Sequence, residues 1–188
     1  MNKTVVIFES KYGSTRRYAE WIARELSCPV FERRKFDLQD LALYDTVVYG
    51  GGLYAGGVSG IQLITKNWGL FCEKNVILFT CGLADPADPA NVAHIRESLS
   101  KVLTPQMQQK LQLFHLRGGI DYSGLNFIHK SMMSMLRKML LKKEPQELSM
   151  EERLLLETYG KRIDFIDQES IRPLVAYVMS APTPPVFL

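Results

Sequence analysis

Residues 4–15 read Thr-Val-Val-Ile-Phe-Glu-Ser-Lys-Tyr-Gly-Ser-Thr, and this stretch decides the fold. Its beginning, residues 4–8, is almost entirely apolar and rich in β-branched side chains, which is typical of a strand covered on both faces of a parallel sheet. Apolar residues then recur at intervals of three or four, as they do on the buried face of a helix. These residues are Ala19, Ile22, Ala23 and Leu26. The stretch therefore predicts a strand, a hydroxyl-rich turn and a crossover helix.

The same alternation continues through the rest of the chain. Apolar, β-branched runs predict further strands at residues 30–31, 45–50, 75–81 and 111–116. Helical periodicity predicts helices over residues 61–68, through Ile95 and Leu99, and from about residue 170 onward. The glycines after residue 49 predict a loop there. Strands that alternate with helices indicate an α/β fold with a parallel sheet.

Length and composition narrow the class of protein. The chain has 188 residues, a length that favours one domain, over residues 1–180. Its formal net charge of +3 is too small to indicate nucleic-acid binding. No apolar run approaches the roughly 18 to 20 residues that span a bilayer, so we expect no transmembrane helix. Residues 1–3 lead straight into a strand-like run without a cleavage site, so we expect no signal peptide. Three cysteines without metal-ligand spacing argue against a disulfide framework and favour a reducing cytoplasm.

The turn after the first strand carries the chemistry. Ser10, Ser14 and Thr15 supply hydroxyl donors, and Gly13 permits close approach of the backbone to a ligand. A helix that begins at such a turn directs free N–H groups and the positive end of its dipole at one point, which suits a phosphate monoester. Lys11 or Arg16 could add positive charge, and the alternative is an ordinary Ser/Thr helix cap.

The pattern Val6-Ile7-Phe8-x-Ser10-x-x-Gly13-x-Thr15-x-x-x-Ala19-x-x-Ile22 resembles the phosphate-loop signature of flavodoxins. It is neither a Walker A loop nor a dinucleotide fingerprint. The resemblance implies a three-layer sandwich whose five-stranded parallel sheet has the order 2-1-3-4-5. It also implies FMN as the cofactor. The phosphate would be held by Ser10, Lys11, Tyr12, Gly13, Ser14 and Thr15.

Two further loops fall where flavodoxins hold the isoalloxazine ring. The first follows the third strand and comprises Gly51, Gly52, Leu53, Tyr54, Ala55 and Gly56. The second follows the fourth strand and comprises Thr80, Cys81, Gly82 and Leu83. The resemblance implies that Tyr54 stacks on the ring, with packing against neighbouring side chains as the alternative. For Cys81 the alternative is a small apolar residue at a strand end.

An insertion over residues 121–165 is longer than a simple connection requires. Its first part, within residues 127–143, predicts a basic amphipathic helix. The apolar face comprises Ile128, Met132, Met135, Leu136 and Met139, and the polar face comprises Lys130, Ser134, Arg137 and Lys138. Such a helix could pack on the body of the protein or on a second subunit, or contact a membrane surface or a lipophilic molecule. Residues 181–188 form a proline-rich tail that we expect to be ordered.

Within the flavodoxin superfamily the chain resembles the menaquinone-dependent protoporphyrinogen oxidase group. The likeness lies in the glycine-rich exit of the third strand leading to Phe71, and in residues 116–122 followed by the methionine-rich helix. It implies oxidation chemistry on a lipophilic porphyrin or quinone, with possible contact at the inner face of the membrane. Tyr12 departs from the usual small or acidic loop residue.

Three functions remain open at this point. The first is an FMN-dependent oxidoreductase, the second a non-catalytic electron carrier, and the third an interaction module that keeps the fold without flavin; a homodimer is compatible with each. We interpret His94, His115 and His129 as packing or surface residues, because they lie in different predicted elements and form no metal-ligand pattern. Asp85 and Asp88 are interpreted as turn residues.

Overall fold

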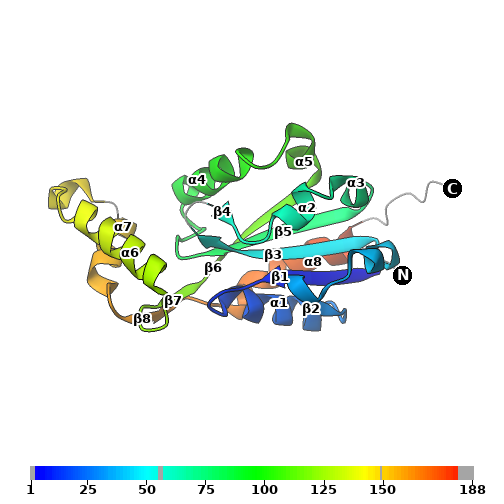
Figure 1. Cartoon of the computed structure of the whole chain (residues 1–188), viewed down its shortest axis with the longest axis horizontal. Helices are drawn as coiled ribbons and strands as arrows, with labels where there is room; N and C mark the ends of the chain where they lie inside the picture. Colours follow the sequence, from blue (N-terminus) through cyan, green and yellow to red (C-terminus); the bar gives the residue numbers. More distant parts are fainter. Residues whose placement is uncertain (1–2, 55–56, 149, 182–188) are drawn as a thin grey trace.

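The computed structural model describes residues 3–54, 57–148 and 150–181. Five parallel strands form the central sheet in the order β2-β1-β3-β5-β6 (Figure 1). They are β1 (Thr4–Glu9), β2 (Val30–Glu32), β3 (Thr46–Tyr54), β5 (Asn75–Gly82) and β6 (Gln112–Arg117). A two-residue strand, β4 (Gly57–Val58), pairs antiparallel with the end of β3. When the five parallel strands alone are numbered along the chain, their order in the sheet is the predicted 2-1-3-4-5.

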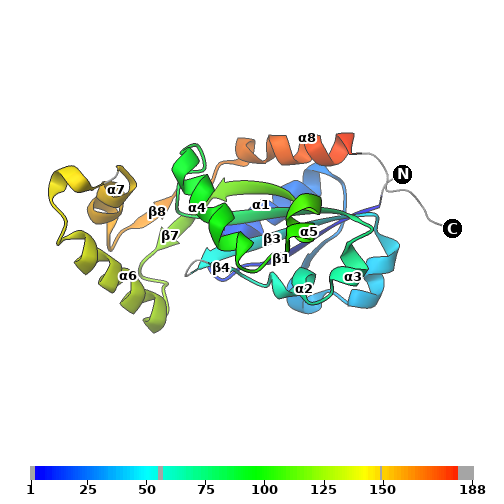
Figure 2. The same ribbon diagram turned by 90° about the horizontal axis from the view of Figure 1, so that it is seen from above.

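Helices cover both faces of the sheet (Figure 2). One face packs against α1 (Ser14–Glu25) and α8 (Arg172–Ser180), and the core between them includes Tyr18, Ile22 and Leu174. The other face packs against α2 (Gln62–Thr65), α3 (Trp68–Phe71), α4 (Pro89–Ser100) and α5 (Pro105–Lys110). Short 3₁₀ helices complete the connections: η1 (Arg33–Lys35), η2 (Leu38–Leu43), η3 (Pro145–Glu147) and η4 (Gln168–Ile171). The predicted three-layer sandwich is confirmed.

The structure differs from the expectations drawn from sequence in several details. The glycine run after residue 49 is not a loop, because β3 continues to Tyr54 and pairs Gly51 and Gly52 with β5. A side chain at Gly50 would collide with the Phe79 ring, so this glycine permits close packing inside the sheet. The helix expected over residues 61–68 is two four-residue helices. The helix α5, capped by the Thr104 hydroxyl, was not predicted.

The insertion extends beyond the carboxyl ends of the parallel strands, at the opposite end of the molecule from the termini (Figure 1). It contains α6 (Phe127–Leu140) and α7 (Met150–Thr158). Two strands that were not predicted, β7 (Gly119–Asp121) and β8 (Arg162–Asp164), pair antiparallel at its base. An ion pair of 2.8 Å joins Arg17 of α1 to Asp164 of β8. The insertion is therefore anchored beside the turn that precedes α1.

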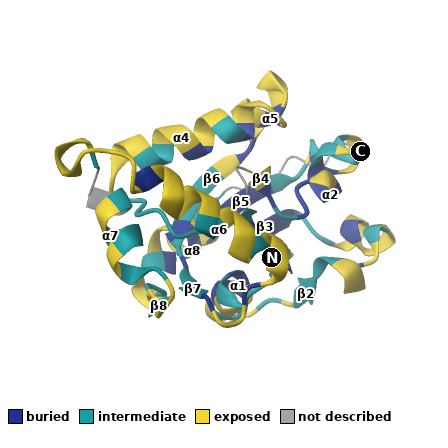
Figure 3. Cartoon of the chain, turned by 60° about the vertical axis from the view of Figure 1, so that its left-hand side comes forward, coloured by how far each residue is buried: buried dark blue, intermediate teal, exposed yellow. Residues whose placement is uncertain are grey.

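The helix α6 is largely exposed to solvent (Figure 3). Its buried member is Leu140, whereas Phe127 and Met135 keep 86% and 66% of their surface exposed. Ile128, Met135 and Met139 of the apolar face therefore do not pack on the body of the protein. No helix in the described part of the chain is long and apolar enough to cross a membrane. The proline-rich tail, residues 181–188, was expected to be ordered. Its residues 182–188 lie outside the described residues.

Candidate functional site

The turn between β1 and α1 has the backbone geometry of an anion site. Gly13 stands at the N-cap of α1 with a φ of 96°, in the left-handed region that favours glycine. The Ser10 hydroxyl accepts a hydrogen bond of 3.1 Å from the Gly13 N–H and closes the turn. No side chain caps α1, and its first turn carries no acidic residue. The alternative of an ordinary Ser/Thr cap is therefore wrong, and the first N–H groups of α1 are available for an anion.

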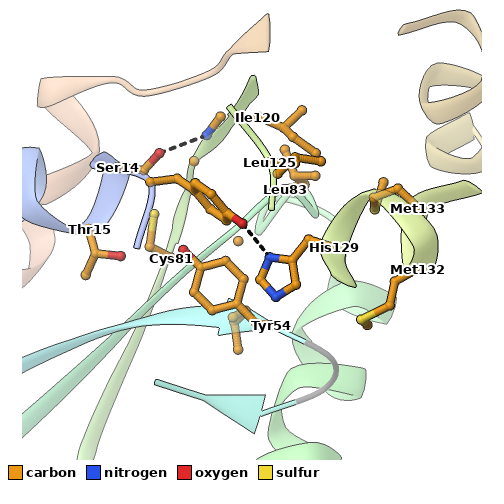
Figure 4. Close-up of a pocket in the computed structure, with 15 residues that line it drawn as sticks. Ser14, Thr15, Tyr54, Cys81, Leu83, Ile120, Leu125, His129, Met132 and Met133 are labelled. Atoms are coloured by element: carbon orange, nitrogen blue, oxygen red, sulfur yellow. Dashed lines mark hydrogen bonds between the residues drawn. The ribbon is translucent and has the colours of Figure 1, made fainter. Parts of the chain in front are cut away.

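A cavity of about 150 Å³ opens beside this turn (Figure 4). Three parts of the chain converge on it: the start of α1, the carboxyl ends of β3 and β5, and the insertion. The body of the protein contributes Tyr12, Ser14, Thr15, Leu53, Tyr54, Cys81, Gly82 and Leu83. The insertion and the residues leading to it contribute Gly118, Gly119, Ile120, Leu125, His129, Met132 and Met133. The lining is mainly apolar and aromatic, as is typical of sites for flat organic ligands.

Three aromatic rings meet at one side of the cavity. The His129 ring lies stacked on the Tyr54 ring, with centroids 5.3 Å apart and planes inclined by 21°. Tyr12 meets both rings edge-on, at 5.8 Å from Tyr54 and 5.6 Å from His129. The Tyr12 hydroxyl and Nδ1 of His129 are hydrogen-bonded at 2.8 Å. Residues from the turn between β1 and α1, a strand end and the insertion are thus joined in one cluster.

A polar groove lies on the other side of the same aromatic cluster. Tyr54 and His129 line it too, together with Glu9, Ser10, Lys11, Glu32, Arg34 and Ser59. Glu9 forms an ion pair with Arg33 at its edge. The predicted phosphate turn is therefore divided: Tyr12, Ser14 and Thr15 face the apolar cavity, whereas Ser10 and Lys11 face the polar groove.

Burial shifts the pKa values of the titratable side chains that line the cavity. It raises the pKa of the Cys81 thiol to about 12, although a hydrogen bond with Thr15 works in the opposite direction. Burial also raises the pKa of Tyr54 to about 12. Desolvation, followed by the nearby Lys11 ammonium, lowers the pKa of His129. At neutral pH the thiol, the phenol and the imidazole are therefore uncharged, and an uncharged ring system can lie against them without an unpaired charge.

Most of the predicted site residues surround the cavity or the groove, and a few do not. Gly51 and Gly52 are buried inside β3, where Gly52 leaves room for its own strand's Tyr54 ring: a Cβ there would lie 2.6 Å from that ring. The Thr80 hydroxyl is hydrogen-bonded to Nδ1 of His115 at 2.8 Å rather than directed into the cavity. Ala55 and Gly56 lie outside the described residues.

Sequence reasoning missed the contribution of the insertion. His129 was interpreted as a packing or surface residue, but it lines both the cavity and the groove. Met132 and Met133 follow it by three and four residues, which places all three toward one side of α6. The available signal was the position of the insertion directly after the strand β6, whose carboxyl end meets the other site loops.

The two aspartates that were interpreted as turn residues have structural partners. Asp85 forms an ion pair of 2.7 Å with Arg117, and the Asp88 carboxylate accepts a hydrogen bond from the Ala90 N–H at the start of α4. The helix cap confirms Asp88 as a residue of the turn. Within residues 3–54, 57–148 and 150–181, no group of three His, Cys, Asp or Glu side chains is arranged to hold a metal ion.

Comparison with known proteins relates this geometry to a family. Residues 5–148 match the family model described as Flavodoxin domain. A flavodoxin from the domain Archaea is 17% identical, with 60% of this chain and 84% of that chain covered and a TM-score of 0.39. Flavodoxin 2 from Bacillus cereus is 20% identical over 61% of this chain and 85% of its own, with a TM-score of 0.40. No curated protein sequence matches the chain.

A third solved structure is a flavoprotein in complex with FMN from Lactobacillus acidophilus. It is 17% identical, with 62% of this chain and 93% of that chain covered and a TM-score of 0.39. At these identities the likeness concerns the fold alone.

Proposed function

We propose, from the premise that this chain belongs to the flavodoxin domain family, that it binds FMN and acts as an oxidoreductase on a small lipophilic substrate. The observation that carries the proposal is the uncapped start of α1 at Gly13, which opens on an apolar and aromatic cavity. A phosphate at one end and a flat apolar ring at the other are the two chemical features of FMN. The geometry therefore matches both ends of the ligand.

The residues present fit this cofactor. The N–H groups at the start of α1, with the Ser14 hydroxyl beside them, would hold the phosphate. Tyr54, Leu53 and Leu83 would contact the ring, and a left-handed Gly13 with no atom within 4 Å of a Cβ position leaves the turn open to the ligand. FMN itself supplies hydride or electron transfer, while the protein binds, orients and desolvates it.

Turnover on a lipophilic substrate is favoured over simple electron carriage by the insertion. Ile120, Leu125, Met132 and Met133 add an apolar wall to the cavity, which a partner exchanging electrons at the surface would not require. The resemblance to the protoporphyrinogen oxidase group points to porphyrins and quinones as the substrates to assay first. A non-catalytic carrier would bind FMN but show no turnover with either, and a flavin-free interaction module would not bind FMN.

A second proposal concerns the partner of α6. Exposed apolar residues and basic residues alternate along this helix, and the lysines that follow it extend the positive charge to Lys143. We propose that α6 rests on an anionic membrane surface, where apolar side chains enter the interface and basic ones meet lipid headgroups. A lipophilic substrate would then reach the cavity from the membrane.

The first experiment is a titration of the purified protein with FMN and, separately, with riboflavin, followed by flavin fluorescence. We expect FMN to bind more tightly, because only FMN carries the phosphate. In Ser14→Asp, a carboxylate beside the turn should lower the affinity for FMN by about tenfold or more while changing the affinity for riboflavin little. Ser14→Ala removes the hydroxyl without adding a charge, so it should weaken FMN binding less than Ser14→Asp. Equal affinity for both flavins, unaffected by the aspartate, would rule out the phosphate site.

A further inference from the structure

The cluster of Tyr12, Tyr54 and His129 is more than a rim of the cavity. Tyr54 comes from the end of β3, while His129 comes from α6, a helix of the insertion that belongs to no part of the sheet. The ring of His129 is directed toward the body of the protein, against Tyr54, as Figure 4 shows. A surface histidine that merely fills space would have no need of this orientation.

Two hydrogen bonds position His129, one through its backbone and one through its ring. Its backbone N–H donates to the Asn126 side chain at 2.8 Å, which places it in the first turn of α6. Its Nδ1 is hydrogen-bonded to the Tyr12 hydroxyl at 2.8 Å. The helix cap thus fixes the backbone of His129 at the start of α6, and the Tyr12 hydroxyl holds its ring over the cavity.

The loop after β5 provides no aromatic ring that could lie opposite Tyr54 across the cavity. Residues 82–88 read Gly-Leu-Ala-Asp-Pro-Ala-Asp and contain no aromatic side chain. Within the described residues, the aromatic groups that line the cavity are Tyr12, Tyr54 and His129. Since Tyr12 lies edge-on to the other two rings, His129 is the ring that lies nearly parallel to Tyr54.

We propose that His129 contacts the cofactor: the isoalloxazine ring enters between Tyr54 and His129, so that the insertion supplies the second stacking surface of the site. The proposal rests on FMN binding as proposed above. Carbon atoms in contact lie about 3.5 to 4.0 Å apart, so a flat ring needs its two neighbours at roughly 7 to 8 Å. Tyr54 and His129 are 5.3 Å apart and must separate when the ring enters.

The structure permits that separation. The buried residue of α6 is Leu140, at its far end, whereas the turn that carries His129 is exposed on its outer side. Outward movement of this first turn would break the hydrogen bonds that His129 and the Asn126 N–H make with the Tyr12 hydroxyl, but would leave the core of the sheet unchanged. The insertion then acts as a mobile wall that closes on a bound ring.

The test compares FMN affinity and the visible absorption spectrum of His129→Ala, His129→Phe and the unaltered protein. We expect His129→Ala to weaken FMN binding by about tenfold, as is typical when one stacking partner is removed, and to shift the visible bands of the bound flavin. Phenylalanine keeps a ring but cannot bond to Tyr12, so His129→Phe should bind FMN within about twofold of the unaltered protein. His94→Ala, on the exposed surface of α4, is the matched control.

Each contrary result has a distinct meaning. Tighter binding in His129→Ala would show that His129 only obstructs the cavity, and unchanged binding would show that it makes no contact; both overturn the proposal. Equal weakening in His129→Ala and His129→Phe would show that an aromatic ring at this position is not what holds the flavin, and would also overturn it. An unaltered protein that fails to bind FMN would overturn the proposed function together with this inference.

Discussion

The left-handed backbone conformation of Gly13, in the turn between β1 and α1, contributes to the stability of the protein. Its φ of 96° is costly for any residue with a Cβ, although a Cβ would meet no atom within 4 Å. We expect Gly13→Ala to lower the free energy of unfolding by about 1 to 2 kcal/mol through backbone strain alone. Urea denaturation without flavin measures this. Gly69→Ala, which also has open space but no positive φ, should be neutral or slightly stabilising, and an equal loss in both variants would contradict the argument.

His115 should make the folded state sensitive to acid. Burial, followed by the charge of Arg96, lowers its pKa from 6.5 to about 4. The unfolded chain therefore binds the proton first, so stability is full above pH 6.5 and is lost as the pH falls toward 4. Because the ring is partly exposed, we expect a loss of about 1 to 2 kcal/mol between pH 7 and pH 5.

The measurement is urea unfolding of the unaltered protein and of His115→Gln at both pH values. Glutamine does not titrate, so the difference between pH 7 and pH 5 should shrink by that amount. His94→Gln serves as the control, because His94 is exposed. A variant that loses as much stability on acidification as the unaltered protein would show that other groups account for the effect.

Among the elements, the short β7–β8 pair holds the insertion in place. A side chain on Gly119 would lie 2.5 Å from the carbonyl oxygen of Ile163, on the opposite strand. The Gly119 N–H also donates to the Ser14 hydroxyl at 3.3 Å, which joins the insertion to the phosphate turn. A single methyl group at this position should therefore separate the insertion from the sheet.

We expect Gly119→Ala to make amide exchange in β7, β8 and α6 roughly tenfold faster, which corresponds to about 1.4 kcal/mol of local opening, while β1, β3 and β5 stay protected. Hydrogen exchange followed by mass spectrometry resolves these segments. In Gly124→Ala the nearest atom would be 3.8 Å away, an ordinary contact, so exchange should be unchanged. Loss of protection throughout the sheet would contradict the view that the insertion opens locally.

The elements differ in how far the sequence predicts them. The strands β1, β3 and β5 have long apolar runs, and a chain that buries both faces of a strand must carry such runs. The strands β7 and β8 have three residues each, too few to show a period, and they pair only through contacts distant in sequence. The end of β3 was mistaken for a loop because local glycine preference was overruled by pairing with β5.

The candidate site shows the same division. Ser10, Gly13 and Thr15 belong to one local turn, so spacing along a single segment is enough to predict that they lie together. His129 depends on a contact with Tyr12 across 117 residues, and no periodicity in either segment encodes that contact. Its position beside Tyr54 follows only once the path of the insertion is known.

For the whole molecule, the exposed face of α6 should decide where the protein resides. Ile128 and Met135 are 65% and 66% exposed, far above the value for residues that pack on a core. If α6 rests on an anionic membrane, the protein should sediment with vesicles containing phosphatidylglycerol more than with phosphatidylcholine alone, and added salt should weaken this binding. Replacing Ile128 and Met135 together by aspartate should weaken it by about tenfold or more.

Leu70→Asp provides a matched control, because Leu70 is 53% exposed on α3, away from the insertion. It should bind vesicles like the unaltered protein, since the charge enters a surface that meets no lipid. Sedimentation velocity without lipid tests whether a second copy of the chain covers the apolar face of α6 instead. A dimer that dissociates in the Ile128→Asp, Met135→Asp variant, with no vesicle binding by the unaltered protein, would assign the face of α6 to a second copy of the chain, because apolar burial between subunits would then take the place of burial in lipid.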